Sequence, residues 1–151
     1  MDSLYAGVDL LSLDAGNTIL FLDHARLEAV AREAGHEVDA ATLIDCEGQA
    51  KRALSGRGEV VRVAWAHDGA PGAASWGAMI ATILARAGVA KAELPAVLDH
   101  AWASHVKHNL YSKVPEGFSD AMAERRGAGG KVACVSNSEG MLDSLFRELG
   151  I

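Results

Sequence analysis

The sequence predicts an α/β fold in which two short strands are joined through an inserted bundle of helices. Apolar runs of strand length, Val8 to Leu13 and Val132 to Val135, lie near the two ends of the chain, and each is followed by small or polar residues. The long stretch between them repeats apolar residues at helical spacing. If the two strands are parallel and adjacent, their polar ends meet at one edge, where open α/β sheets bind ligands.

The first strand leads into the most informative segment, Leu10 to Thr18, which reads LLSLDAGNT. Asp14 follows the apolar run directly, and a carboxylate displayed in this way is a candidate nucleophile. The small residues after it, beginning with Ala15 and Gly16, let the backbone curl so that amide groups face an anion. Thr18 adds a hydroxyl to this candidate site. Because an ordinary turn begins in the same way, a purely structural role stays open.

The second strand belongs to the segment Lys131 to Asn137, which reads KVACVSN. Ser136 and Asn137 offer a hydroxyl and an amide at its end, and Ser138 is a candidate N-cap for a following helix. Apolar residues at helical spacing extend that helix: Leu142, Leu145, Phe146 and Leu149. In a parallel pair of strands, Ser136 and Asn137 lie beside Asp14 and bind the same anion. A plain helix cap is the alternative interpretation of these two residues.

Four amphipathic helices are predicted between the strands: Leu27 to Ala34, Leu43 to Leu54, Trp76 to Ala87, and Leu94 to Val106. Since apolar stripes must face one another, we expect a small bundle with the three tryptophan rings in its core. Residues 55–72 are rich in glycine, which predicts either a loop or an extension of the second helix. The expected boundaries of the insert lie near Phe21 and between Tyr111 and Pro115.

The segment LSLDAGNTI, the helical insert, and the segment from Val114 to Ile151 together resemble the haloacid dehalogenase-like hydrolase superfamily, in the branch whose helical cap lies between the first and second motifs. The resemblance spans nearly the whole chain. It implies a partial Rossmann-like core of residues 1–21 and 112–151, with a helical cap over residues 22–111. It is less specific for the reaction, because that superfamily includes phosphatases, dehalogenases, phosphonate hydrolases and mutases.

The same resemblance implies roles for individual residues. It makes Asp14 the catalytic nucleophile and Thr18 the residue that steadies it. The phosphoryl group is then held by Ala15, Gly16, Ser136 and Asn137. Magnesium is the implied cofactor, coordinated by the Asp14 carboxylate and by the backbone carbonyl of Gly16.

Two departures from the family pattern lower the expected activity. Phosphatases of this family usually carry a second aspartate two residues after the nucleophile as general acid and base, whereas this chain has Gly16. Positioned acid–base catalysis contributes roughly 10²- to 10⁴-fold in rate. The chain also stops at Ile151, so the family's third-motif lysine and fourth-motif aspartates have no counterpart. We therefore expect a truncated relative that is a weak catalyst or none.

The expected function is hydrolysis of a small phosphate ester through an aspartyl nucleophile. One alternative is a non-catalytic remnant that binds an anion or a protein. Another is dehalogenation at carbon, although the family's dehalogenases usually have an aromatic residue where Gly16 stands. Asp23 and His24, just past the first motif, are candidate substitutes for the missing proton donor.

Charge and composition limit the partners. The net charge of −6, with no basic run beyond Arg125 and Arg126, argues against nucleic acid. The sequence has no apolar run of about 18 residues, so it predicts no membrane span. Cys46 and Cys134 are isolated, so no disulfide framework is expected. We expect a cytoplasmic protein with a small anionic substrate, prone to self-association or completed by another chain. The histidines at 100, 105 and 108 are expected on a solvated helix face.

Overall fold

The computed structural model describes residues 7–65, 67, 70–136 and 141–151. It divides into two compact units. The strand unit comprises Met1–Leu22 and Tyr111–Ile151, and the helical unit comprises Asp23–Leu110. Within the described ranges, no helix combines the length and the apolar character needed to cross a membrane.

The predicted α/β class with a partial Rossmann-like core is wrong. In the part of the chain that the structure describes, six α-helices accompany a sheet of just two strands, and helix is the dominant secondary structure. The two strands do form and pair in parallel, but each has four residues. A sheet this small offers no layer for helices to cover on both faces, so most apolar side chains are buried between helices instead.

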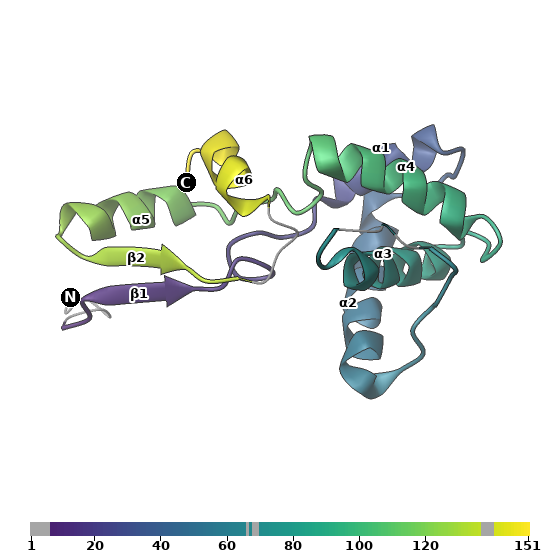
Figure 1. Ribbon diagram of the computed structural model, residues 1–151, viewed down its shortest axis with the longest axis horizontal. Helices are drawn as coiled ribbons and strands as arrows, with labels where there is room; N and C mark the ends of the chain where they lie inside the picture. Colours follow the sequence, from purple (N-terminus) through teal and green to yellow (C-terminus); the bar gives the residue numbers. More distant parts are fainter. Residues whose placement is uncertain (1–6, 66, 68–69, 137–140) are drawn as a thin grey trace. The chain divides into compact units, whose positions relative to one another are not determined.

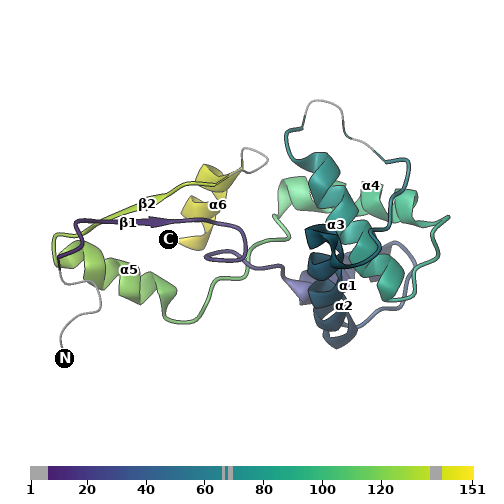
Figure 2. The same ribbon diagram turned by 90° about the horizontal axis from the view of Figure 1, so that it is seen from below.

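In the strand unit, β1 (Leu10–Leu13) pairs with β2 (Lys131–Cys134), and Leu13 is the register partner of Cys134. The two arrowheads point the same way in Figure 1. Helix α5 (Phe118–Gly127) runs alongside β2 in both views (Figures 1 and 2). Along β1, half-buried residues alternate with exposed ones, so one face of the sheet is covered.

The buried core of the strand unit is small. It consists of Ala15, Ile19 and Leu20, from the turn after β1, together with Leu145 of α6 (Leu142–Leu149). The N-cap of α6 is Met141, so this helix begins later than the predicted start at Ser138, which lies outside the described residues. Partly buried apolar side chains pack against this cluster, among them Leu13 and Cys134 at the ends of β1 and β2.

The helical unit is the predicted small bundle. Its helices are α1 (His24–Glu33), α2 (Ala40–Arg52), α3 (Ala73–Arg86) and α4 (Leu94–Lys107). Contacts between α1 and α2, α2 and α3, α3 and α4, and α4 and α1 close the bundle. Aspartate side chains cap the first two helices, where they accept hydrogen bonds from backbone amides in the first turn. Figures 1 and 2 show these four helices together.

The glycine-rich connection combines both structures that the sequence left open. A π-helical turn, Ala53–Arg57, extends α2 and contains Gly56 at a left-handed φ of 84°. Residues 58–65, which we call the strap, then cross α3 without regular helix. The amide of Val61 donates to the Thr82 hydroxyl, and the Arg86 guanidinium donates to the Glu59 carbonyl.

Aromatic rings fill the bundle, as predicted for the tryptophans. Trp65, Trp76 and Trp102 contact one another with ring centroids 5.0–5.9 Å apart. His105 joins them, 5.0 Å from Trp76 and 5.4 Å from Trp102. The expectation of a solvated His105 is wrong, because its side chain is on the inner face of α4 and the residue is 1% exposed. His105 and His108 are one helical turn apart, which suggested that they share a face. Tertiary packing nevertheless buries His105 and leaves His108 exposed.

Acid should destabilise the helical unit through His105. Burial lowers the pKa of His105 from its ordinary value of 6.5 to about 4, and its Nε2 has no hydrogen-bond partner among the described atoms. The unfolded chain therefore gains a proton near pH 6.5 that the folded chain accepts only near pH 4. The contribution of neutral His105 to the free energy of unfolding is therefore fully present above pH 6.5. It declines by about 3 kcal/mol as the pH falls from 6.5 to 4.

Urea unfolding followed by tryptophan fluorescence measures this effect, because the three tryptophans all belong to the helical unit. His105→Gln should flatten the pH dependence over that window, whereas His108→Gln, at an exposed position, should leave it unchanged. If the pH dependence of stability is unchanged in His105→Gln, it does not arise from the His105 imidazole.

Position 77 has room only for glycine, because the Trp65 ring of the strap packs closely against α3 there. A Cβ at Gly77 would lie 2.5 Å from Cε3 and Cζ3 of the Trp65 ring. Gly77→Ala should therefore destabilise the helical unit by about 1–3 kcal/mol, since displacing the ring outweighs a helix-propensity gain of up to about 1 kcal/mol. Gly48→Ala on α2 is the control, because its Cβ meets nothing closer than Arg52 Nη1 at 3.8 Å. Equal unfolding midpoints for the two variants in urea would refute this account.

Candidate functional site

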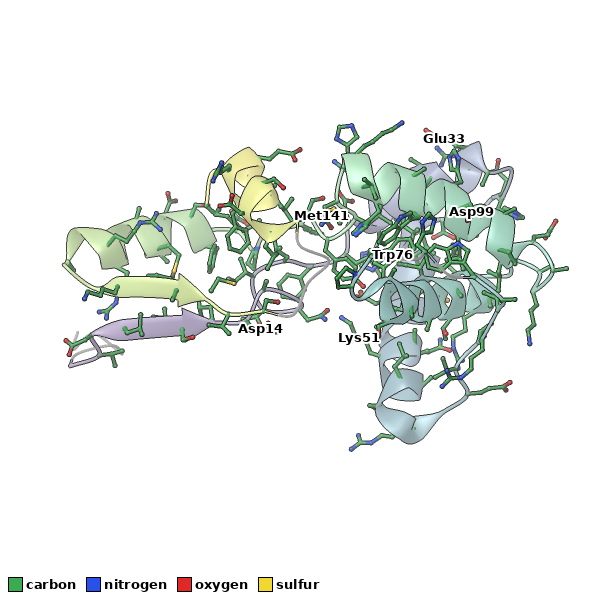
Figure 3. The ribbon with its side chains drawn as sticks, viewed as in Figure 1. Asp14, Glu33, Lys51, Trp76, Asp99 and Met141 are labelled. Atoms are coloured by element: carbon green, nitrogen blue, oxygen red, sulfur yellow. The ribbon has the colours of Figure 1, made fainter. Side chains whose placement is uncertain are left out.

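Asp14 and Ser136 leave the sheet at the same edge. Asp14 follows Leu13, the last residue of β1, and Figure 3 shows it just beyond the strand. Since Leu13 pairs with Cys134 in parallel register, Ser136 lies two residues beyond the matching end of β2. The Val135 amide donates to the Leu13 carbonyl at 2.9 Å, which continues the pairing to this point. The register therefore brings the two predicted site residues to the ends of adjacent strands.

A second observation places the Asp14 carboxylate near β2. The pKa of the Cys134 thiol is raised, chiefly because the thiol is removed from water and also because the negative charge of Asp14 is close. The Asp14 side chain itself is exposed, whereas Ser136 is half-buried. The carboxylate is thus open to a ligand while its backbone is held by the strand pair.

The turn after Asp14 is tightly hydrogen bonded. The Ala15 carbonyl accepts from the amides of Thr18, Ile19 and Leu20 at 3.3, 2.9 and 2.8 Å. The Asn17 amide donates to the Leu20 carbonyl, and Asn17 has a left-handed φ of 59°, which asparagine tolerates better than most residues. With Ala15, Ile19 and Leu20 buried, the turn is anchored to the core of the strand unit.

These hydrogen bonds decide which amides can face an anion. The N–H groups of Asn17 and Thr18 are used inside the turn, whereas those of Ala15 and Gly16 take no part in it. Thr18 is exposed. Of the predicted phosphate-binding residues, Ala15 and Gly16 follow Asp14 directly and Ser136 lies beyond the end of the neighbouring strand, whereas Asn137 lies outside the described residues.

Asp23 and His24 make their visible contacts inside the helical unit. The Asp23 carboxylate caps α1 by accepting from the Arg26 amide, and His24 Nε2 is 2.9 Å from Glu47 Oε2. Lys51 Nζ is 2.8 Å from the other Glu47 oxygen. Sequence reasoning missed Glu47, although an acidic side chain within the apolar stripe of α2 is a signal for a buried polar contact.

The candidate metal ligands are hard oxygen donors. The Asp14 carboxylate and the Gly16 carbonyl are of the type that Mg²⁺ binds, and this ion commonly keeps several waters and shares phosphate oxygens of a substrate. Across the described ranges, no three His, Cys, Asp or Glu side chains gather as a metal-binding group. The donor chemistry is compatible with magnesium, and its binding stays a prediction.

Comparison of the chain with family models and with curated proteins gave no match. The resemblance to haloacid dehalogenase-like hydrolases therefore stays a prediction that depends on the motif residues.

Proposed function

We propose that the chain is a slow hydrolase of small phosphate esters, similar to haloacid dehalogenase-like hydrolases, with Asp14 as nucleophile. The single observation that carries this proposal is the parallel register of β1 and β2, which brings Asp14 and Ser136 to one edge of the sheet. The exposed carboxylate has its backbone held between a strand and a hydrogen-bonded turn, as a positioned nucleophile requires.

In the proposed reaction, a carboxylate oxygen of Asp14 bonds to phosphorus while the P–O bond to the leaving alcohol breaks. The alkoxide takes a proton from solvent, and water then hydrolyses the acyl phosphate to release inorganic phosphate and restore the carboxylate. The Ser136 and Thr18 hydroxyls and the amides of Ala15 and Gly16 donate hydrogen bonds to the phosphoryl oxygens. Magnesium, held by Asp14 and Gly16, would supply charge neutralisation of the phosphoryl group.

Turnover should be slow because Gly16 carries no acid that could protonate the leaving group. Substrates whose alcohol is a good leaving group are therefore favoured over alkyl esters. The same feature supports a second candidate function, in which the amides and hydroxyls bind a phosphate-like anion without turnover. We also propose a cytoplasmic location, which the two free thiols support.

Assaying p-nitrophenyl phosphate with and without magnesium tests the proposal. We expect slow, magnesium-dependent release of p-nitrophenol by the purified chain. A 2-chloro acid assayed for chloride release distinguishes dehalogenation at carbon. Binding of inorganic phosphate without any turnover favours the anion-binding function, and neither turnover nor binding contradicts both.

A further inference from the structure

The strap forms a bridge over α3 that is anchored at both ends. At one end, the Val61 amide donates to Thr82 Oγ1 at 3.1 Å. At the other, the indole Nε1 of Trp65 donates to Asp99 Oδ1 of α4 at 2.9 Å. Figure 3 labels Asp99 on that helix. These two hydrogen bonds to side chains of the bundle hold the strap against α3.

A cavity of about 240 Å³ lies beneath the strap. Its lining includes Trp65 and three small residues of α3, which are Ala74, Gly77 and Ala78. Val61 and Val63 of the strap and Leu98 of α4 also line it. An engineered apolar cavity of about 150 Å³ is enough to bind benzene, so this one has room for a single aromatic ring.

One cation lines this apolar cavity. The Arg62 side chain is exposed and has no ion pair or hydrogen bond among the residues that the structure describes. An unpaired guanidinium beside apolar walls matches a ligand with an apolar body and one anionic group. A carboxylate fits best, because its two oxygens accept the paired N–H donors of arginine.

We propose that the helical unit binds a small aromatic carboxylate in this cavity. The ring lies against the Trp65 indole among the apolar walls, and the carboxylate faces Arg62. This site goes beyond the proposed phosphate-ester hydrolysis, since it belongs to a different unit and selects an aromatic ring that the Asp14 site does not require.

Titration of the full chain with benzoate tests the proposal, with the tryptophan indole N–H resonances as the readout and Trp65→Phe to assign the Trp65 signal. We expect saturable shifts of that signal with a dissociation constant on the order of millimolar, as befits so small a ligand. Benzyl alcohol, which has the ring without the charge, should bind about tenfold more weakly.

Two variants separate the charge from the cavity. Arg62→Gln should weaken benzoate about tenfold and leave benzyl alcohol unchanged, whereas Arg52→Gln, an exposed arginine of α2 that does not line the cavity, should affect neither ligand. Ala78→Leu should abolish binding of both ligands by filling the cavity. Ala74→Leu serves the same purpose if Ala78→Leu does not fold, as judged by circular dichroism.

Absence of saturable benzoate shifts in the folded wild type overturns the proposal. Unchanged benzoate affinity in Arg62→Gln also overturns it, as does unchanged affinity in a folded cavity-filling variant. None of these results depends on hydrolysis, so failure of this site is distinguishable from failure at Asp14.

Discussion

Asp14→Asn is expected to reduce hydrolysis of p-nitrophenyl phosphate by about 10³-fold or more, because an amide oxygen cannot replace the attacking carboxylate. The substitution preserves the shape of the side chain and leaves the backbone hydrogen bonds of the turn in place, which involve residues 15 and 17–20. The measurement is kcat under saturating substrate with magnesium, together with circular dichroism to verify folding.

The matched control is Asp9→Asn. Asp9 precedes the same strand at its opposite end, where its carbonyl accepts from the Lys131 amide. It has the same charge and is also exposed, so its replacement should leave turnover within about twofold of wild type. Equal losses in the two variants would point to the net charge of the strand unit rather than to a nucleophile.

The same substitution separates hydrolysis from simple anion binding. The Asp14 carboxylate repels a phosphate anion that the neighbouring amides and hydroxyls attract, so its neutralisation should strengthen binding of inorganic phosphate. A hydrolase loses turnover while phosphate affinity rises. A protein that only binds the anion has no turnover to lose. For such a protein, the Asp14→Asn substitution changes only the affinity for inorganic phosphate, which calorimetry measures.

Gly16→Asp is expected to raise kcat by about 10²-fold, by placing a general acid two residues after the nucleophile. The backbone tolerates this change, because Gly16 is not among the residues with positive φ and a Cβ there meets nothing within 4 Å. Neighbouring Asn17, at a φ of 59°, does not offer the same freedom. The glycine at position 16 therefore reflects no steric demand of the turn.

Gly16→Asn is the control for this gain, since it has the shape of aspartate without the acid. Its kcat should stay near that of wild type, and the double variant Asp14→Asn with Gly16→Asp should remain inactive. The gain should also grow with the pKa of the leaving alcohol, because poor leaving groups depend most on protonation. If Gly16→Asp and Gly16→Asn have the same kcat, the missing acid is not what limits the reaction.

Local patterns predicted the four helices of the bundle well, but they did not predict α5. Apolar stripes such as the one through Trp76, Ile80 and Leu84 indicate which face is buried, since a helix must place that face against another. The two strands and the turn that follows Asp14 were likewise predictable from short segments. Each of these features depends on residues within a few positions of one another.

The fold class and the buried polar contacts were not predictable in that way. Two strand signals suggested an α/β core, but the size of a sheet depends on pairing partners that no local pattern specifies. The contact between His24 and Glu47 joins residues 23 positions apart, and the burial of His105 depends on its packing against Trp76 of the neighbouring helix α3. Such contacts depend on how helices pack.

The sequence by itself determined where the four bundle helices and the two strands form, and which polar residues follow each strand, because these depend on side-chain periodicity and local backbone preference. Only the tertiary structure decided that the sheet has two strands, that Asp14 and Ser136 share an edge, and that a cavity lies under the strap. The physical reason is that strand pairing and side-chain packing are long-range choices among many compatible partners, settled by the free energy of the whole fold.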